Sequence, residues 1–175
     1  MFGAGITLFF SLIWASAFYI YIKNRKVIRS GLLLGTLSFL FCVLWPLGYP
    51  GYVDYLYYNN LFPFLEEIVK FSAIYFYPFG GDYSDKEFYV MGASLGVCFS
   101  FLENFSISGS LALFLIINIF VTSLHVTTAT ISSYITFKSK YYGDKGWLFL
   151  IVIPILIHYF YNEVLVDYLI NMFNL

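Results

Sequence analysis

Long apolar segments separated by short polar ones run along the whole of this chain. Six segments are long and apolar enough for one helix each: 3–22, 31–49, 61–79, 88–107, 110–135 and 147–170. About 20 apolar residues let a helix cross the hydrocarbon core of a bilayer. The pattern therefore predicts an all-α, polytopic membrane protein with about six transmembrane helices in a single domain, 1–175.

Composition agrees with this prediction. The chain of 175 residues is 61% hydrophobic and only 11% charged, with a mean hydropathy of +0.80, whereas soluble domains carry about 25% charged residues. Six spans with short loops leave no room for a soluble domain. The net charge of −1 gives no sign of nucleic acid, and Cys42 and Cys98 both lie in apolar segments, which disfavours a disulfide framework. The lipid bilayer is the expected environment.

The basic residues of the loops gather on one side. Eight of the nine Lys and Arg residues follow the first, third and fifth segments, and in a six-span protein these three loops share one face. Cytoplasmic loops are enriched in Lys and Arg. We therefore expect a multi-pass protein of the cell membrane with both termini external.

Ionisable side chains interrupt only segments three to six. They are Glu66, Glu67 and Lys70 in the third, Glu103 in the fourth, His125 in the fifth and His158 in the sixth, with Glu163 and Asp167 near its external end. A charged residue at the bilayer centre costs about 2.5–3.5 kcal/mol on insertion scales. We expect five of them, Glu66, Glu67, Glu103, His125 and His158, to face one polar cavity enclosed by segments three to six, because a shared cavity offsets that cost.

Helical spacing supports a shared cavity. Lys70 lies three and four residues after the two glutamates, so it can pair with either on one helix face. In the spacing Gly92-x-x-x-Gly96, two glycines permit close approach of another helix. A polar stripe crosses the fifth segment, made of Asn118, Thr122, His125, Thr128 and Ser132. Glu67, Glu103, His125 and His158 are therefore expected around one water-accessible site in the outer half of the membrane.

Carboxylates and imidazoles in such a cavity can activate water or bind a divalent metal. The simplest role for Lys70 is a structural ion pair. A lone buried histidine is often only a hydrogen-bonding tie between helices. Five titratable groups in four helices favour a common site instead.

Four motifs in order resemble those of the PrsW-type membrane proteases, in the superfamily of type II CAAX prenyl endopeptidases. "EEIVK" (66–70) resembles the E-E-x-x-K motif, and Phe99 to Asn104 resembles F-x-x-x-E-N. His125 stands where the histidine of the third motif is expected, and His158 with Asn162 resembles H-x-x-x-N. The resemblance covers roughly residues 62–165.

The resemblance implies an intramembrane endopeptidase that cleaves a single-span, anti-sigma-factor-like membrane protein. Glu66 or Glu67 would be the general base for water. Glu103 would complete a ligand set or hold a histidine in its tautomer, with Lys70, Phe99, Asn104 and Asn162 in support. Glu67, Glu103, His125 and His158 are candidate ligands of a divalent metal such as zinc. A metal-free reaction, with the histidines as oxyanion donors, uses the same residues.

Two other functions fit the same residues. Buried Glu, Lys and His could form the relay of a proton- or ion-coupled transporter or channel. The superfamily also includes a non-catalytic scaffold subunit of gamma-secretase, so a scaffold that binds a transmembrane helix is the third possibility.

Overall fold

The computed structural model describes residues 25–47, 61–78, 83–105 and 111–166, and these residues form helices with short links. The helices are α2 (Arg25–Leu47), α4 (Phe62–Phe76), α5 (Asp85–Phe105), α6 (Leu111–Tyr142) and α7 (Val152–Phe160). A 3₁₀ segment, η1 (Lys145–Ile151), precedes α7, and a π-helical segment, η2 (Tyr161–Val166), follows it. The expected all-α class is confirmed for the described part of the chain.

Local sequence explains where several of these helices begin and end. Pro63 lies in the first turn of α4, where its missing N–H is not needed. At the start of α5, Ser84 and Glu87 form a reciprocal capping box, in which the Ser84 N–H donates to Glu87 Oε2 at 2.9 Å. α6 ends where Gly143 adopts a φ of 68°, a left-handed conformation that favours glycine.

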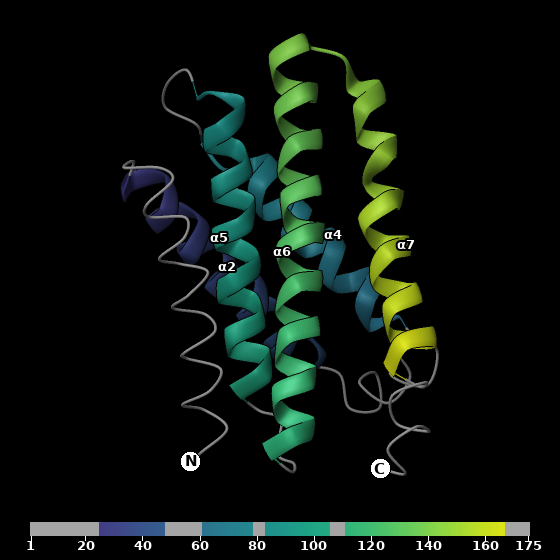
Figure 1. The fold of residues 1–175 in the computed structure, drawn as a ribbon. Helices are drawn as coiled ribbons and strands as arrows, with labels where there is room; N and C mark the ends of the chain where they lie inside the picture. Colours follow the sequence, from purple (N-terminus) through teal and green to yellow (C-terminus); the bar gives the residue numbers. More distant parts are fainter. Residues whose placement is uncertain (1–24, 48–60, 79–82, 106–110, 167–175) are drawn as a thin grey trace.

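α5 lies between α2 and α6, and glycines bring these three helices close together (Figure 1). A Cβ atom on Gly92 would lie 2.5 Å from the Ala129 carbonyl oxygen of α6, and one on Gly96 would overlap the backbone of His125. On the other face, a Cβ on Gly31 of α2 would lie 2.5 Å from the Met91 oxygen. The close approach expected at Gly92 and Gly96 is present, and Gly31 and Gly35 make a second one that was not anticipated.

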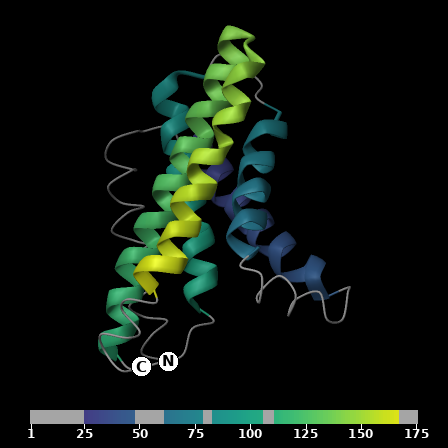
Figure 2. The ribbon, with the colours of Figure 1, turned by 90° about the vertical axis from the view of Figure 1, so that its right-hand side faces the viewer.

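α4 and α7 complete the bundle around α6. α4 contacts α2, α6 and α7, and α7 also contacts α6. Figure 2 shows α6 and α7 running side by side, with α4 inclined to both. The four helices α4, α5, α6 and α7, which carry the glutamates and histidines expected in the site, therefore meet around one interior region.

Two helices extend beyond the predicted spans. Residues 25–30 were expected in a loop but belong to α2, where Val27 is fully buried and Ser30 hydrogen-bonds Tyr77 at 2.7 Å. The fifth segment was expected to end at 135, but α6 continues to Tyr142 because nothing interrupts the helix before Gly143. The predicted segment 3–22 lies outside the described residues.

Among the described residues, two helical stretches are long and apolar enough to cross a membrane: Arg25–Leu44 and Lys145–Val164. The basic residues of α5, α6 and η1 lie at the beginning of α5 and η1 and at the end of α6, which share the end of the bundle at the top of Figure 1. The basic residues of α2 lie at its beginning, which is lower, at the left of Figure 1. The described residues thus show two possible spans and one basic end.

Candidate functional site

Six ionisable side chains from four helices meet inside the bundle. Glu66, Glu67 and Lys70 come from α4, Glu103 from α5, His125 from α6 and His158 from α7; we call these six residues the Glu/His cluster. Successive contacts join Glu103, His125, Lys70, Glu67, His158 and Glu66 into one chain of groups. The tertiary structure therefore brings together all five residues expected in the catalytic site.

Glu67 is fully buried, and one of its oxygens is saturated with donors. Oε1 accepts from Lys70 Nζ at 2.5 Å, from His158 Nδ1 at 2.8 Å and from the Thr128 hydroxyl at 3.0 Å. Oε2 is buried and, within the part of the chain that the structure describes, has no hydrogen-bond partner. Glu67 thus accepts hydrogen bonds from side chains of α4, α6 and α7 at once, an arrangement that suits a residue that orients its neighbours.

Lys70 is also fully buried and extends across the centre of the Glu/His cluster. Its Nζ donates to Glu67 Oε1 and lies 2.8 Å from His125 Nδ1. The same nitrogen lies 4.8 Å from the centroid of the Phe99 ring, whose face stabilises a cation. The expected ion pair exists, and it is with Glu67.

His125 is held between Lys70 and Glu103. Its Nε2 lies 2.5 Å from Glu103 Oε2, and its ring packs against Phe99 with centroids 5.0 Å apart. The His125 side chain is 1% exposed, whereas that of Glu103 is 33% exposed. Glu103 is therefore the most accessible member of the Glu/His cluster.

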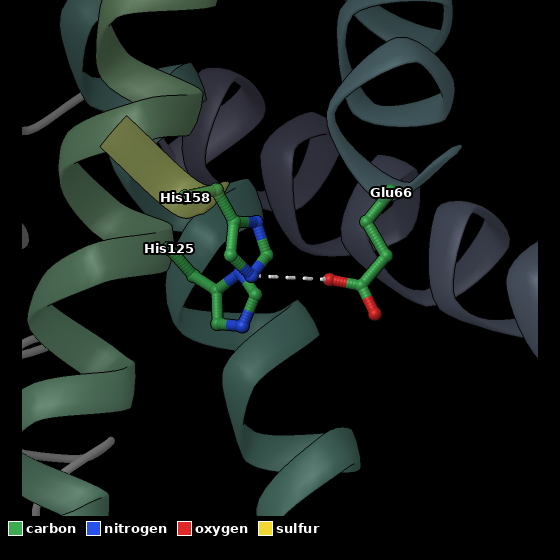
Figure 3. Close-up of side chains that lie close together, drawn as sticks. All are labelled: Glu66, His125 and His158. Carbon is green, nitrogen blue, oxygen red and sulfur yellow. Dashed lines mark ion pairs between the residues drawn. The ribbon is translucent and has the colours of Figure 1, made fainter. Parts of the chain in front are cut away.

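Glu66 and His158 face each other at the other end of the chain of contacts. His158 Nε2 lies 3.7 Å from Glu66 Oε2, as Figure 3 shows. That Glu66 oxygen is buried and has no hydrogen-bond partner among the described residues. A buried carboxylate oxygen without a donor is costly, so this position suits a water molecule, a proton or a cation.

The two expected supporting asparagines lie apart from these contacts. The Asn104 amide donates to the Ser100 hydroxyl at 3.0 Å, and Ser100 hydrogen-bonds Thr122 at 2.8 Å, so Asn104 ties α5 to α6. Asn162 is half-buried in η2, and within the described residues no hydrogen bond joins its side chain to the Glu/His cluster.

The predicted polar stripe of α6 faces the protein interior. Thr122, His125, Thr128 and Ser132 are all buried, whereas the side chain of Asn118 is outside the described set. Of these, Thr128 reaches Glu67 directly, a role that spacing alone did not reveal. Its position three residues after His125 was the available signal, since such residues share a helix face.

The group of residues whose ligand atoms could hold a metal ion differs from the predicted ligands. Ligand atoms of Glu66, His125 and His158 lie within 4.8 Å of one another, whereas the predicted ligands were Glu67, Glu103 and both histidines. Zinc bonds of about 2.0–2.2 Å would need these atoms somewhat closer. Moreover, both ring nitrogens of His125 already have partners, Lys70 and Glu103. As arranged, the three residues do not fit a zinc ion unless His125 releases one partner.

The Glu/His cluster combines an unpartnered carboxylate with two imidazoles and a buried ammonium. A carboxylate of this kind can accept a proton from water, and an imidazole N–H can stabilise an oxyanion. Comparisons with protein-family models, with curated proteins and with solved structures found no match.

Proposed function

We propose that the chain is a polytopic intramembrane endopeptidase in which Glu66 activates a water molecule that hydrolyses a peptide bond of a single-span membrane protein. The observation that carries this proposal is the unpartnered, buried Glu66 Oε2 beside His158 Nε2. The resemblance of the four ordered motifs to the PrsW-type proteases supports it.

A membrane location is part of the proposal, with six spans and both termini external. Large apolar side chains are exposed on the outer faces of two helices: Leu33, Leu37, Phe41 and Leu44 on α2, and Val152, Ile153, Leu156 and Phe160 on α7. Exposed apolar faces of this extent are unfavourable in water and favourable against lipid. The basic end of the bundle would then face the cytoplasm.

Glu66 and Glu67 have different roles in this proposal. Glu67 Oε1 already accepts three hydrogen bonds and pairs with Lys70, so proton transfer to it would weaken all of them. Glu66 lacks such partners and lies beside His158. We therefore assign the general base to Glu66 and a positioning role to Glu67.

The reaction balances with these residues alone. Glu66 takes a proton from water while the water oxygen bonds to the carbonyl carbon of the scissile peptide. His125, which now meets Glu103 through Nε2, donates to the resulting oxyanion when substrate enters on the exposed side of Glu103. The proton on Glu66 then passes to the leaving nitrogen as the C–N bond breaks, which releases an amine and a carboxylic acid.

The test is cleavage by purified protein in detergent of a panel of single-span substrates. We expect Glu66→Gln to lower the rate about 10²–10⁴-fold, the usual contribution of general acid–base catalysis. Glu87→Gln is the matched control, because Glu87 lies in the first turn of α5, far from the Glu/His cluster, and glutamine keeps its cap. Equal absence of cleavage in wild type and Glu66→Gln across the panel would reject the proposal.

A proton-coupled transporter is the second candidate, favoured by the unbroken chain of six ionisable groups from Glu103 to Glu66. It predicts pH-dependent flux in proteoliposomes that Glu103→Gln abolishes. A scaffold instead predicts a stable complex with a transmembrane helix, weakened by His125→Ala or His158→Ala, without cleavage or flux. The three functions thus give different results with the same purified protein.

A further inference from the structure

The two histidines of the Glu/His cluster present the same ring nitrogen, Nδ1, to partners of opposite character. His125 Nδ1 lies 2.8 Å from Lys70 Nζ, and His158 Nδ1 lies 2.8 Å from Glu67 Oε1. An ammonium can only donate, and a carboxylate can only accept. The partners therefore demand different protonation at the same atom of the two rings.

We infer that the buried Lys70–Glu67 ion pair acts as a positioning pair that sets opposite neutral tautomers on the two histidines. Lys70 donates to His125 Nδ1, so the proton of that ring is on Nε2. Glu67 accepts from His158 Nδ1, so the Nε2 of that ring carries a lone pair.

The surrounding contacts are consistent with both assignments. An Nε2–H on His125 donates to Glu103 Oε2 at 2.5 Å. A lone pair on His158 Nε2 explains why its distance to Glu66 Oε2 is 3.7 Å, longer than a hydrogen bond, since both atoms are acceptors. Lys70 Nζ lies beside Glu67 Oε1 and over the face of Phe99.

The consequence for chemistry rests on the proposed function. His125 then supplies the N–H for the oxyanion, while His158 supplies an acceptor that orients the water beside Glu66. One ion pair thus gives different tasks to two imidazoles that come from the contacting helices α6 and α7. A second-sphere carboxylate that fixes the tautomer of a histidine is a known device in enzyme sites.

Long-range ¹H–¹⁵N spectra of histidine-labelled protein read the tautomers without any activity assay. The chain has only two histidines, so His125→Gln and His158→Gln assign both signals. Spectra are recorded near pH 8.5, about two units above the ordinary histidine pKa of about 6.5. We expect wild type to give Nε2–H for His125 and Nδ1–H for His158. The same tautomer in both rings would overturn the inference.

Two variants test whether the Lys70–Glu67 ion pair sets the two tautomers. In Glu103→Gln, His125 should keep its proton on Nε2, because Lys70 still donates to Nδ1. A mixture of His125 tautomers in this variant would mean that Glu103, and not Lys70, sets the tautomer, which would overturn the inference. In the paired variant Glu67→Leu with Lys70→Met, which leaves no uncompensated charge, His158 should change to Nε2–H and donate to Glu66. A His158 that stays Nδ1–H would overturn the inference.

A matched control and an activity assay separate the two proposals. Thr128→Val removes a neutral donor from the same Glu67 oxygen and should leave both tautomers unchanged, whereas a tautomer change there would contradict the role of the ion pair. If wild type has the expected tautomers but cleaves no substrate, the positioning pair is supported and the peptidase is rejected. If wild type cleaves substrate but both histidines have the same tautomer, the peptidase is supported and the positioning pair is rejected.

Discussion

His125 Nε2 lies 2.5 Å from Glu103 Oε2, and this contact between α6 and α5 depends on Gly96, which lies about two helical turns before Glu103 on α5. A Cβ atom on Gly96 would overlap the backbone carbonyl of His125 itself. Close packing of the two helices and the geometry of the Glu/His cluster are therefore coupled at a single residue.

Gly96→Ala tests this coupling. Overpacking of a tight contact typically costs about 1–3 kcal/mol, and the gain in helix propensity of about 1 kcal/mol offsets only part of it. We expect a lower melting temperature in detergent and a reduced cleavage rate. Gly146→Ala is the control, because its Cβ would approach only the exposed Asp144 carboxylate at 3.0 Å. Equal melting temperatures for wild type and Gly96→Ala would contradict the coupling.

Lys70→Met tests the energetic role of the buried ion pair. Removal of one partner leaves Glu67 buried without its cation, which typically costs about 3–5 kcal/mol. The paired substitution Glu67→Leu with Lys70→Met should be less destabilising than Lys70→Met alone, because no charge is left uncompensated. The free energies of unfolding of both variants are measured in detergent by denaturant titration, with circular dichroism as the signal. A double variant less stable than the single one would show that the pair contributes little by its charge.

Glu66 and Glu67 should respond differently to the same substitution. Glu66→Gln should reduce cleavage with little change in melting temperature, because Glu66 Oε2 has no hydrogen-bond partner to lose. Glu67→Gln should lower the melting temperature, since Lys70 loses its buried counter-charge. Parallel thermal melts and cleavage rates measure the difference. A catalytic defect confined to Glu67→Gln would assign the base to Glu67 instead.

Metal analysis of purified protein tests the zinc alternative. We expect occupancy near zero in wild type, because His125 uses both ring nitrogens for Lys70 and Glu103. The series Glu103→Gln, His125→Ala and His158→Ala should then be equally free of metal. Stoichiometric zinc in wild type that falls in His125→Ala and His158→Ala would establish a metal site and replace the metal-free reaction.

Single cysteines test the proposed topology in a background without Cys42 and Cys98. Lys140→Cys lies at the basic end of α6, and Leu61→Cys lies at the opposite end of the bundle, before α4. An impermeant maleimide should label Lys140→Cys only from the cytoplasmic side and Leu61→Cys only from outside. Labelling of both from the same side would refute the six-span arrangement.

The sequence by itself determined the helical class and the residue types of the site. Long apolar segments separated by short polar links permit little other than helices, since a helix satisfies its backbone hydrogen bonds within each segment. The i, i+3 spacing placed Lys70 within reach of Glu67, and the stripe of Thr122, His125 and Thr128 indicated an inward face of α6. These features are local, so the period of the helix was enough to find them.

The tertiary structure settles which glutamate receives the donors of the Glu/His cluster. Glu66 and Glu67 are adjacent and chemically identical, but consecutive helix residues point about 100° apart. Glu67 Oε1 consequently accepts from Lys70, Thr128 and His158, while the buried Oε2 of each glutamate has no hydrogen-bond partner among the described residues. Those contacts join residues up to 91 positions apart, and their geometry follows from how closely the glycines let the helices approach, which helical periodicity does not specify.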